Sequence, residues 1–252
     1  MGKTAIITGG STGIGAGIAL QLAKNGYDIG ISVCRDRMKA MTLCKEIINL
    51  GRKVFYCTMD LTDIDTIAPF FEKARIEFEH LDLFVNNAGI TLKAPFLSCD
   101  ASVIDTLYEV DYKGAYLVMQ KAAQWMIETQ TKGSIVVISS NNGIAHYAGV
   151  SVYGSIKAAM NKLVEHIAIE IAPHGIRINT IAPGWTDTGS SRLDEKESTF
   201  YKIPLKRWVQ TQEIGDAVVF LSSPSAASIT GATLVMDGGA CLLSDKMEKY
   251  EA

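Results

Sequence analysis

Short apolar runs alternate with longer segments of helical periodicity from one end of the chain to the other. The apolar runs predict strands at Lys3–Thr8, Tyr27–Val33, Lys53–Thr58, Leu81–Val85, Ser134–Ser139, Arg177–Ile181 and Thr233–Met236. Most of them lack an apolar/polar alternation, which is typical of parallel strands buried on both faces. The intervening segments predict helices at Gly13–Lys24, Met38–Leu50, Asp63–Glu79, Ala101–Gln130, Val150–Ala172 and Gln212–Leu221.

Strands that alternate with helices of this length indicate right-handed βαβ units. The pattern therefore predicts an α/β fold, a doubly wound (Rossmann-type) parallel sheet of about seven strands with helices on both faces. No Ser- or Pro-rich linker and no internal repeat divides the sequence, so we expect a single domain over residues 1–252. The only long stretch without clear periodicity is 184–208, which we expect to cover the carboxyl ends of the strands as a substrate loop.

Charge and cysteine content exclude several classes of function. The 24 basic and 27 acidic residues leave a net charge of −3, and they form no basic stripe of the kind that binds nucleic acid. No apolar run approaches the roughly 18 residues of a membrane span, and the sequence starts without the pattern of a targeting segment. The five cysteines have no C-x-x-C spacing. We therefore expect a cytoplasmic protein with no metal, nucleic-acid or membrane partner.

A glycine-rich turn follows the first predicted strand and leads directly into a predicted helix. Glycines at this point permit a tight turn and a close approach of the backbone to a pyrophosphate, whose charge faces the helix N-terminus. The placement between strand and helix favours nucleotide binding over a merely flexible loop. The predicted phosphate-binding residues are Gly9, Ser11, Thr12, Gly13, Ile14 and Gly15.

The end of the second strand bears on the choice of nicotinamide cofactor. An acidic residue there would bond the ribose 2′-hydroxyl, whereas an arginine accommodates a 2′-phosphate. Val33 occupies the expected carboxylate position and Arg35 follows it, which favours NADP(H) over NAD(H). NAD remains the alternative, because Asp36 is close by, Thr12 is not basic, and Arg35 also fits a solvated loop cation.

Polar and small residues follow the third and fourth predicted strands, where side chains can reach an adenine edge or tie neighbouring strands together. We expect Asn87 both to hold the sheet and to line the pocket. The predicted contacts of this group are Asp60, Leu61, Asn87, Ala88 and Gly89.

The second half of the chain carries candidate catalytic residues. Ser140 closes the fifth strand, and Tyr153 and Lys157 lie four residues apart in a helical pattern, so they share one helix face. A nearby ammonium and an oxidised nicotinamide ring both favour the phenolate, which suits a tyrosine to proton transfer. Ser140 would bond the substrate oxygen. By itself, a Tyr-x-x-x-Lys pair is also common on exposed helix faces.

Taken together, these motifs resemble the short-chain dehydrogenase/reductase family over nearly the whole chain. The resemblance rests on Thr8-Gly9-x-x-x-Gly13-x-Gly15, Asp60, Asn87-Ala88-Gly89, Ser140, Tyr153-x-x-x-Lys157 and Pro183-Gly184. It implies that Tyr153 is the general acid/base, that Lys157 holds the nicotinamide ribose, and that Ser140 orients the carbonyl. It also implies an adenine contact for Asp60, and further cofactor contacts for Ile181, Pro183, Gly184, Thr186 and Thr188.

One position departs from the family pattern. The family usually has asparagine in Val-Asn-x-x-Gly, where it holds a water that links the lysine to solvent. Here the stretch is Val110-Asp111-Tyr112-Lys113-Gly114. Asp111 can accept the same hydrogen bond, but a carboxylate also stabilises the Lys157 ammonium. We therefore include Asp111 among the catalytic residues and expect an altered pH profile rather than an inactive enzyme.

The sequence specifies the substrate only loosely. We expect an NADP(H)-dependent enzyme that interconverts a ketone and a secondary alcohol. The predicted substrate loop contains four aromatic residues: Trp185, Phe200, Tyr201 and Trp208. They favour a bulky apolar substrate such as a hydroxysteroid, or else they pack against one another within the loop. His146 is a further candidate contact, or an ordinary loop histidine. The alternatives are a sugar dehydrogenase and a 3-oxoacyl-[acyl-carrier-protein] reductase, although Thr131-Lys132 and His174 stand where arginines would favour the latter.

Two other classes are weaker alternatives. A non-catalytic NADP-sensing protein would be expected to lose the tyrosine or the lysine, and an enoyl reductase of the divergent branch would space them more widely. Neither change is present at Tyr153 and Lys157. The predicted helix 150–172 is apolar on more than one face, and family members pair this helix across subunits, so the resemblance implies a homodimer or homotetramer.

Overall fold

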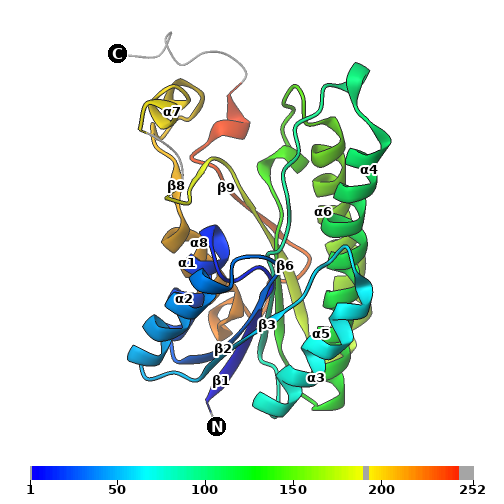
Figure 1. The fold of residues 1–252 in the computed structure, drawn as a ribbon, viewed down its shortest axis with the longest axis vertical. Helices are drawn as coiled ribbons and strands as arrows, with labels where there is room; N and C mark the ends of the chain where they lie inside the picture. The colour runs from blue at the N-terminus through cyan, green and yellow to red at the C-terminus, as the bar shows by residue number, and fades with distance from the viewer. Residues whose placement is uncertain (1, 190–192, 244–252) are drawn as a thin grey trace.

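A twisted, fully parallel sheet forms the centre of the molecule (Figure 1). The computed structural model describes residues 2–189 and 193–243. Seven strands lie in the order β3-β2-β1-β4-β5-β6-β9. The bounds are β1 Lys3–Ile7, β2 Tyr27–Val33, β3 Val54–Thr58, β4 Leu83–Asn86, β5 Ser134–Ile138, β6 Arg177–Pro183 and β9 Thr233–Met236. The order reverses between β1 and β4, so the predicted doubly wound sheet is confirmed.

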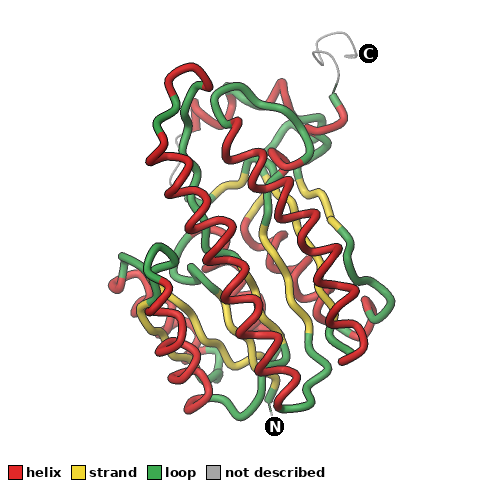
Figure 2. Tube along the Cα trace, turned by 90° about the vertical axis from the view of Figure 1, so that its right-hand side faces the viewer, coloured by secondary structure: helices red, strands yellow, loops and turns green. Residues whose placement is uncertain are grey.

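Helices cover both faces of the sheet, and each face has its own apolar core (Figures 1 and 2). One layer contains α1 Gly13–Lys24, α2 Arg37–Asn49 and α8 Thr211–Ser222. The other contains α3 Ile67–Glu77, α4 Ala101–Tyr108, α5 Ala115–Glu128 and α6 Ser151–Ile171. Because both faces are buried, the central strands are continuously apolar, as the sequence predicted.

Strand register brings the functional loops to one edge. Ile7 of β1 lies opposite Ile31 of β2 on one side and Val85 of β4 on the other. Farther along the sheet, Ile138 of β5 lies opposite Ile181 of β6. All strands run in the same direction, so the segments that follow them leave the sheet together, and ligands of such sheets bind at this carboxyl edge.

Two predicted helices are interrupted. The segment predicted as one helix over 101–130 contains a π-helical turn, Glu109–Gly114, between α4 and α5. This turn buries the carboxyl group of Asp111, and it presses Gly114 so closely on Leu61 that a Cβ would lie 2.7 Å from the Leu61 Cβ. The segment predicted over 63–79 starts as a 3₁₀ turn, Ile64–Thr66, capped by the Asp63 side chain, before α3 begins. π-Turns inside helices often mark functional sites.

The stretch 184–208, predicted as irregular, contains short elements. Strand β7, Thr186–Asp187, pairs in parallel with β8, Val209–Gln210, in a separate two-stranded sheet. Between them lie helix α7, Leu193–Glu197, and a 3₁₀ turn, Phe200–Lys202. In Figure 1 this segment stands above the carboxyl ends of the strands, on the side of α1 and α8. Among the described residues, no helix is both long enough and apolar enough to traverse a lipid bilayer.

Candidate active site

The turn between β1 and α1 is crowded in a way that requires glycine. Gly9 and Gly13 have φ values of +60° and +54°, in the left-handed region that favours glycine. A Cβ on Gly15 would lie 2.4 Å from the carbonyl oxygen of Gly9. Thr12, the N-cap of α1, makes no side-chain cap bond, so the first backbone N–H groups of this helix remain available to an anionic ligand.

A cleft of about 460 Å³ extends from this turn along the carboxyl edge of the sheet. Its lining includes most of the predicted cofactor contacts: Gly9, Ser11, Thr12, Ile14, Gly15, Arg35, Asp60, Leu61, Asn87, Ala88, Gly89 and Thr188. Gly13 faces Thr188 just beside the cleft. Pro183, Gly184 and Thr186 lie outside its lining, and Ile181 is fully buried in β6.

Sequence reasoning missed several residues of this cleft. They are Ser32, Cys34, Met59, Ile90 and Val110, and Asp36 also lies in the wall. Most of them directly neighbour a predicted contact, so extending each motif by one residue would have included them. Ser32 could have been found from the buried strand end, because its hydroxyl accepts a hydrogen bond from the Gly9 backbone N–H at 3.1 Å.

Asn87 ties the end of β4 to the glycine turn. Its side-chain amide donates to the carbonyl oxygens of Thr8 and Gly9, at 2.9 and 3.1 Å. Its backbone N–H donates to the Thr8 hydroxyl at 2.9 Å. The side chain therefore fixes two neighbouring loops while it lines the cleft, so the structural and pocket-lining roles expected for Asn87 coexist.

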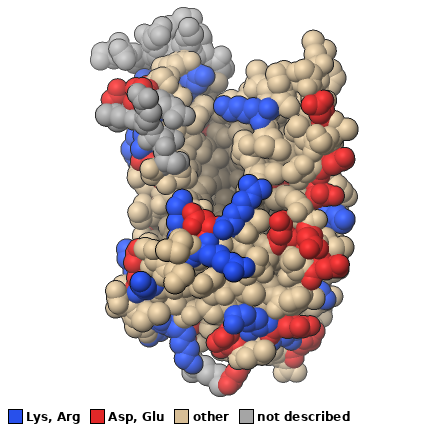
Figure 3. All heavy atoms as spheres, viewed as in Figure 1, with Lys and Arg blue, Asp and Glu red and all other residues tan. Residues whose placement is uncertain are grey.

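The rim of the cleft beyond β2 is basic. Figure 3 shows Lys and Arg side chains gathered at the lower end of a hollow, over the segment that leads from β2 into α2. Arg35 is exposed and lines the cleft. The Asp36 carboxylate caps α2 by accepting the Lys39 backbone N–H at 3.0 Å, and it also pairs with the Lys39 ammonium at 3.3 Å. Asp36 is thus engaged at the start of α2, whereas Arg35 is exposed at the rim, close enough to Asp60 and Cys34 to interact with both.

Asp60 faces the same part of the cleft. Its carboxylate accepts hydrogen bonds from the backbone N–H and the hydroxyl of Thr62, at 3.0 and 2.8 Å. The backbone bond is the main reason why the pKa of Asp60 lies below its ordinary value. Asp60 therefore presents a fixed negative charge at the place where the sequence predicts an adenine contact.

Ser140 and helix α6 come together through two close glycine contacts. A 3₁₀ turn, Asn141–Gly143, follows Ser140 and packs on α6. A Cβ on Gly143 would lie 2.8 Å from the carbonyl carbon of Lys157. A Cβ on Gly154 would lie 3.0 Å from the carbonyl oxygen of Asn142. Ser140 Oγ accepts hydrogen bonds from the backbone and side-chain nitrogens of Asn142, at 3.1 and 3.3 Å, which leaves its own proton free to donate.

The Lys157 ammonium lies near both the Tyr153 ring and the Asp111 carboxylate. Its ammonium nitrogen lies 5.4 Å from the centroid of the Tyr153 ring and 3.6 Å from Asp111 Oδ2. Lys157 and Asp111 are buried, with 6% and 1% of their surfaces exposed. Lys157 is therefore close to both Tyr153 and Asp111. None of these three residues lines the cleft, but a Cβ on Gly89, which does line it, would lie 3.3 Å from the Lys157 nitrogen.

Burial of Asp111 has an electrostatic cost. Oδ1 accepts the backbone N–H of Ile90 at 2.9 Å, whereas Oδ2 has no hydrogen-bond partner within the described chain. Loss of solvation raises the pKa of Asp111 above its ordinary value, although the Lys157 charge acts in the opposite direction. A Cβ on Gly89 would lie 2.8 Å from Asp111 Oδ1, so glycine is required beside this pair.

A second cavity, of about 690 Å³, opens beside the turn that follows Ser140. Its wall includes His146, Tyr147, Trp185, Tyr201, Lys202 and Cys241. Of the aromatic residues expected to form a substrate wall, Trp185 and Tyr201 do line it. Trp208 instead packs within the loop, where its indole N–H donates to the Thr199 hydroxyl at 2.7 Å. Tyr147 was not singled out by sequence reasoning, because a loop tyrosine carries no motif.

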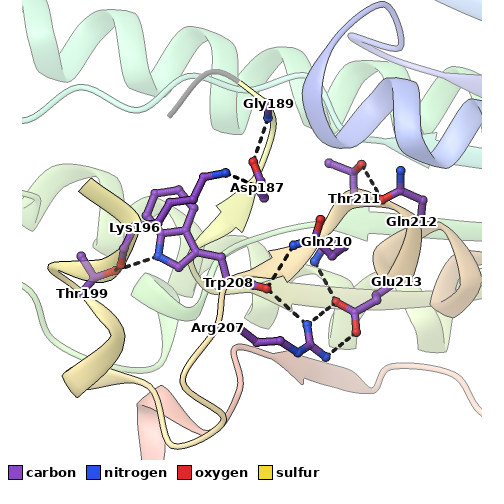
Figure 4. Close-up of polar contacts among 10 residues, drawn as sticks. All are labelled: Asp187, Gly189, Lys196, Thr199, Arg207, Trp208, Gln210, Thr211, Gln212 and Glu213. Atoms are coloured by element: carbon purple, nitrogen blue, oxygen red, sulfur yellow. Dashed lines mark hydrogen bonds and ion pairs between the residues drawn. The ribbon is translucent and has the colours of Figure 1, made fainter. Parts of the chain in front are cut away.

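The loop above the cleft is fastened by polar contacts at both ends (Figure 4). Lys196 of α7 pairs with Asp187 of β7 at 2.5 Å, and its ammonium lies over the Trp208 ring at 6.0 Å. The Arg207 guanidinium makes two bonds to the Glu213 carboxylate, at 2.7 and 2.8 Å. Glu213 also accepts the Gln210 backbone N–H in a capping box at the start of α8. These contacts hold the loop to the residues that border the cleft.

Comparison with known proteins adds independent information. A sequence-family model described as enoyl-(acyl carrier protein) reductase matches residues 9–241. The chain is 35% identical over 243 residues to the L-rhamnose 1-dehydrogenase (NAD(P)(+)) of Sphingomonas sp. (strain SKA58), covering 94% of this chain and 96% of the relative. It is also 35% identical over 242 residues to the 3-oxoacyl-[acyl-carrier-protein] reductase FabG of Staphylococcus aureus (strain Mu50 / ATCC 700699), covering 95% and 98%.

Solved structures of similar proteins superpose on nearly the whole chain. The acetoin dehydrogenase from Enterobacter cloacae superposes with a TM-score of 0.89 at 35% identity, covering 96% of this chain and 97% of the other. A short-chain type dehydrogenase/reductase from Mycobacterium marinum superposes with a TM-score of 0.87 at 30% identity, covering 94% of each chain. Since these matches span nearly the whole chain, they concern the entire fold rather than one motif.

Proposed function

The chain belongs to the short-chain dehydrogenase/reductase family and is an oxidoreductase, and from that premise we propose that it interconverts a ketone and a secondary alcohol with NADP(H). The observation that carries the proposal is that Lys157, 5.4 Å from the Tyr153 ring, lies next to Gly89 of the cleft, while the turn after Ser140 packs on the same helix α6. These groups can bind a carbonyl oxygen and deliver a proton to it, which ketone reduction requires.

The cleft fits a dinucleotide. The crowding at Gly15 leaves room for backbone and phosphate but not for a side chain, and the start of α1 offers free N–H groups to a pyrophosphate. Arg35 is open at the rim while Asp36 is engaged with Lys39, which favours a 2′-phosphate over a free 2′-hydroxyl. Asp60 suits the adenine edge, and Thr188 borders the phosphate end of the cleft.

In the proposed mechanism the protein supplies positioning and proton transfer. When bound in the cleft, a nicotinamide cofactor would supply the hydride for reduction and accept it in oxidation. Ser140 donates its free hydroxyl proton in a hydrogen bond to the substrate oxygen. Tyr153 Oη gives a proton to that oxygen during reduction and takes it back during oxidation, and the Lys157 charge stabilises the resulting phenolate. No described group of His, Cys, Asp and Glu could hold a metal ion, and the scheme uses none.

Asp111 is proposed as a positioning residue for Lys157. A carboxylate 3.6 Å from the ammonium holds the lysine against Tyr153, and it also offsets part of the positive charge that the phenolate meets. This double effect supports the expectation that the pH dependence of turnover differs from that of an asparagine variant.

The cavity beside the cleft bears on the substrate. Its wall combines polar groups such as Tyr147, His146 and Lys202 with apolar side chains, among them Trp185, Ile144 and Leu243. The hydroxysteroid expectation rested on the aromatic loop residues, and Trp208 is occupied inside that loop. Relatives include a sugar dehydrogenase, an acetoin dehydrogenase and a 3-oxoacyl reductase. This range supports a ketone or alcohol substrate, and the four-residue spacing of Tyr153 and Lys157 favours that chemistry over enoyl reduction.

A homo-oligomer is part of the proposal. Apolar side chains on α4 and α5 are exposed in the single chain, among them Ile104, Tyr108 and Tyr116. On α6, Met160 and Val164 are buried in the core of the same subunit, so only the outer face of that helix is available for a partner. The single domain over 1–252 and the cytoplasmic location remain predictions from the sequence.

Cofactor binding tests the first step of the proposal. NADPH and NADH are titrated against the purified protein by fluorescence, with wild type beside Arg35→Ala. We expect NADPH to bind at least about tenfold more tightly, and Arg35→Ala to lose most of that preference, because a charge-assisted bond to phosphate contributes about 1.5–3 kcal/mol.

Arg37→Ala is the matched control, since Arg37 lies two residues away but bonds Thr58 and does not line the cleft. Equal or tighter binding of NADH by the wild type would show that the role assigned to Arg35 is wrong. A panel of hydroxyketones, sugars and hydroxyacyl thioesters, read as NAD(P)H absorbance, then tests turnover.

A further inference from the structure

The cavity beside Ser140 contains a hydrogen-bond donor that the proposed reaction does not use. Tyr147 is half-buried in the cavity wall, next to Trp185. We propose that Tyr147 is a specificity-determining residue that donates a hydrogen bond to a second oxygen of the substrate, close to the reacting carbonyl. The preferred substrate class is then a small hydroxyketone, diketone or vicinal diol. This inference rests on the proposed function and specifies its substrate.

Tyr147 is held in place from two sides. Its hydroxyl oxygen accepts a hydrogen bond from the side-chain amide of Asn141 at 3.0 Å. Its ring packs edge-on against Trp185, with the centroids 5.7 Å apart and the planes at 89°. Asn141 directly follows Ser140, so the residue that fixes the Tyr147 hydroxyl is the chain neighbour of the residue expected to hold the reacting oxygen. The hydrogen bond therefore ties Tyr147 to the segment that carries Ser140.

The Tyr147 hydroxyl can donate a hydrogen bond to a substrate, because its one hydrogen bond in the described structure uses it as an acceptor. Because Asn141 can only donate through its amide nitrogen, Tyr147 acts as acceptor in that contact, and in the described part of the chain its own proton meets no acceptor. Burial raises the pKa of Tyr147 above its ordinary value, so the phenol stays protonated at neutral pH. The group that a substrate meets is a neutral O–H donor.

Two polar groups close to Tyr147 are already engaged. The Asp237 carboxylate accepts the backbone N–H groups of Gly239 and Cys241, at 2.9 and 2.7 Å, and the Asn141 amide at 3.4 Å. The Cys241 thiol donates to the Asn141 carbonyl oxygen, and burial raises its pKa to about 12. Both groups thus stabilise Asn141, which in turn holds the Tyr147 hydroxyl in the cavity wall.

A matched pair of ketones tests the proposal. The rates of reduction of 3-hydroxy-2-butanone and 2-butanone are compared in wild type and Tyr147→Phe, which keeps the ring against Trp185 and removes only the hydroxyl. We expect the wild type to prefer the hydroxyketone, and Tyr147→Phe to lower kcat/KM for it by about tenfold while leaving 2-butanone within about twofold, because one hydrogen bond to the substrate is lost.

Tyr56→Phe is the control, because Tyr56 lies on β3 and lines neither this cavity nor the cofactor cleft; it should leave both rates within about twofold. Thermal unfolding and NADPH titration show whether Tyr147→Phe is folded. Equal loss on both ketones, or no loss on either, would overturn the inference while the proposed function stands. Failure of the wild type to reduce any ketone would overturn both.

Discussion

The pair formed by Asp111 and Lys157 is the least ordinary feature at the scale of single residues. Two charged groups are buried together, yet they are separated by 3.6 Å, a distance that permits an ion pair but is too long for a good hydrogen bond. Desolvation outweighs the attraction, so the pKa of Asp111 is raised. The protein tolerates this cost at a position where the family usually has a neutral asparagine.

This cost predicts a pH-dependent difference between wild type and Asp111→Asn. A carboxyl group whose folded pKa is raised favours the folded state at low pH, and that contribution is lost as pH rises from its ordinary value of 3.8 through the raised value. The asparagine has no proton to lose. Relative to the variant, wild type should therefore lose about 1.4 kcal/mol of unfolding free energy for each unit of pKa shift.

Denaturant unfolding between pH 4 and 7 measures this difference directly. A gap between the two proteins that stays constant over this range would show that Asp111 is not strained by burial. The pH–rate curve of the same variant is a second readout, and an unchanged curve would remove the positioning role proposed for Asp111.

At the scale of elements, helices α1 and α8 approach each other closely at two glycines. A Cβ on Gly17 would lie 2.5 Å from the Cβ of Thr211 and 2.9 Å from its carbonyl carbon. A Cβ on Gly215 would lie 2.7 and 2.9 Å from the Cγ and Cβ of Gln21, and 3.1 Å from the carbonyl oxygen of Gly17. Because the Gln21 Cβ is fixed to the backbone of α1, a side chain at either glycine requires the helices to shift.

A methyl group at either glycine is therefore expected to destabilise the protein. Gly17→Ala should do so by about 1–3 kcal/mol, because the backbone of α8 must shift to admit the methyl group. At Gly215 a similar cost applies, and the better helix propensity of alanine, about 1 kcal/mol, offsets only part of it. Urea unfolding of both variants measures these losses. If either variant is as stable as wild type, the account of this contact is wrong.

The sequence predicted elements well where one physical cause acts alone. β1 to β6 and β9 were found to within a few residues, because burial on both faces makes them continuously apolar. The π-helical turn around Asp111 was missed, since it depends on the contact of Gly114 with Leu61, far away in the chain. β7, α7 and β8 were missed because they are short and are held by side-chain contacts such as Lys196 with Asp187.

At the scale of the whole molecule, some residues of the candidate site belong to sequence motifs and others are brought there only by the fold. Residues in motifs, such as Gly15, Asn87 and Lys157, were predicted because their chemistry needs a fixed spacing. Tyr147 was not, since its place in the cavity depends on Asn141 and Trp185, which the fold brings together from different loops. Sequence therefore predicts the reaction more completely than the substrate.

In the proposed reaction, Tyr153 gives a proton to the ketone oxygen during reduction. The most direct test is Tyr153→Phe, measured for ketone turnover with NADPH and, in parallel, for NADPH binding. Loss of a general acid should lower kcat by about 10²–10⁴-fold, while the Kd for NADPH changes by less than about twofold. Tyr108→Phe, on the exposed surface of α4, serves as the control. A Tyr153→Phe variant that turns over at a near-normal rate would contradict the account.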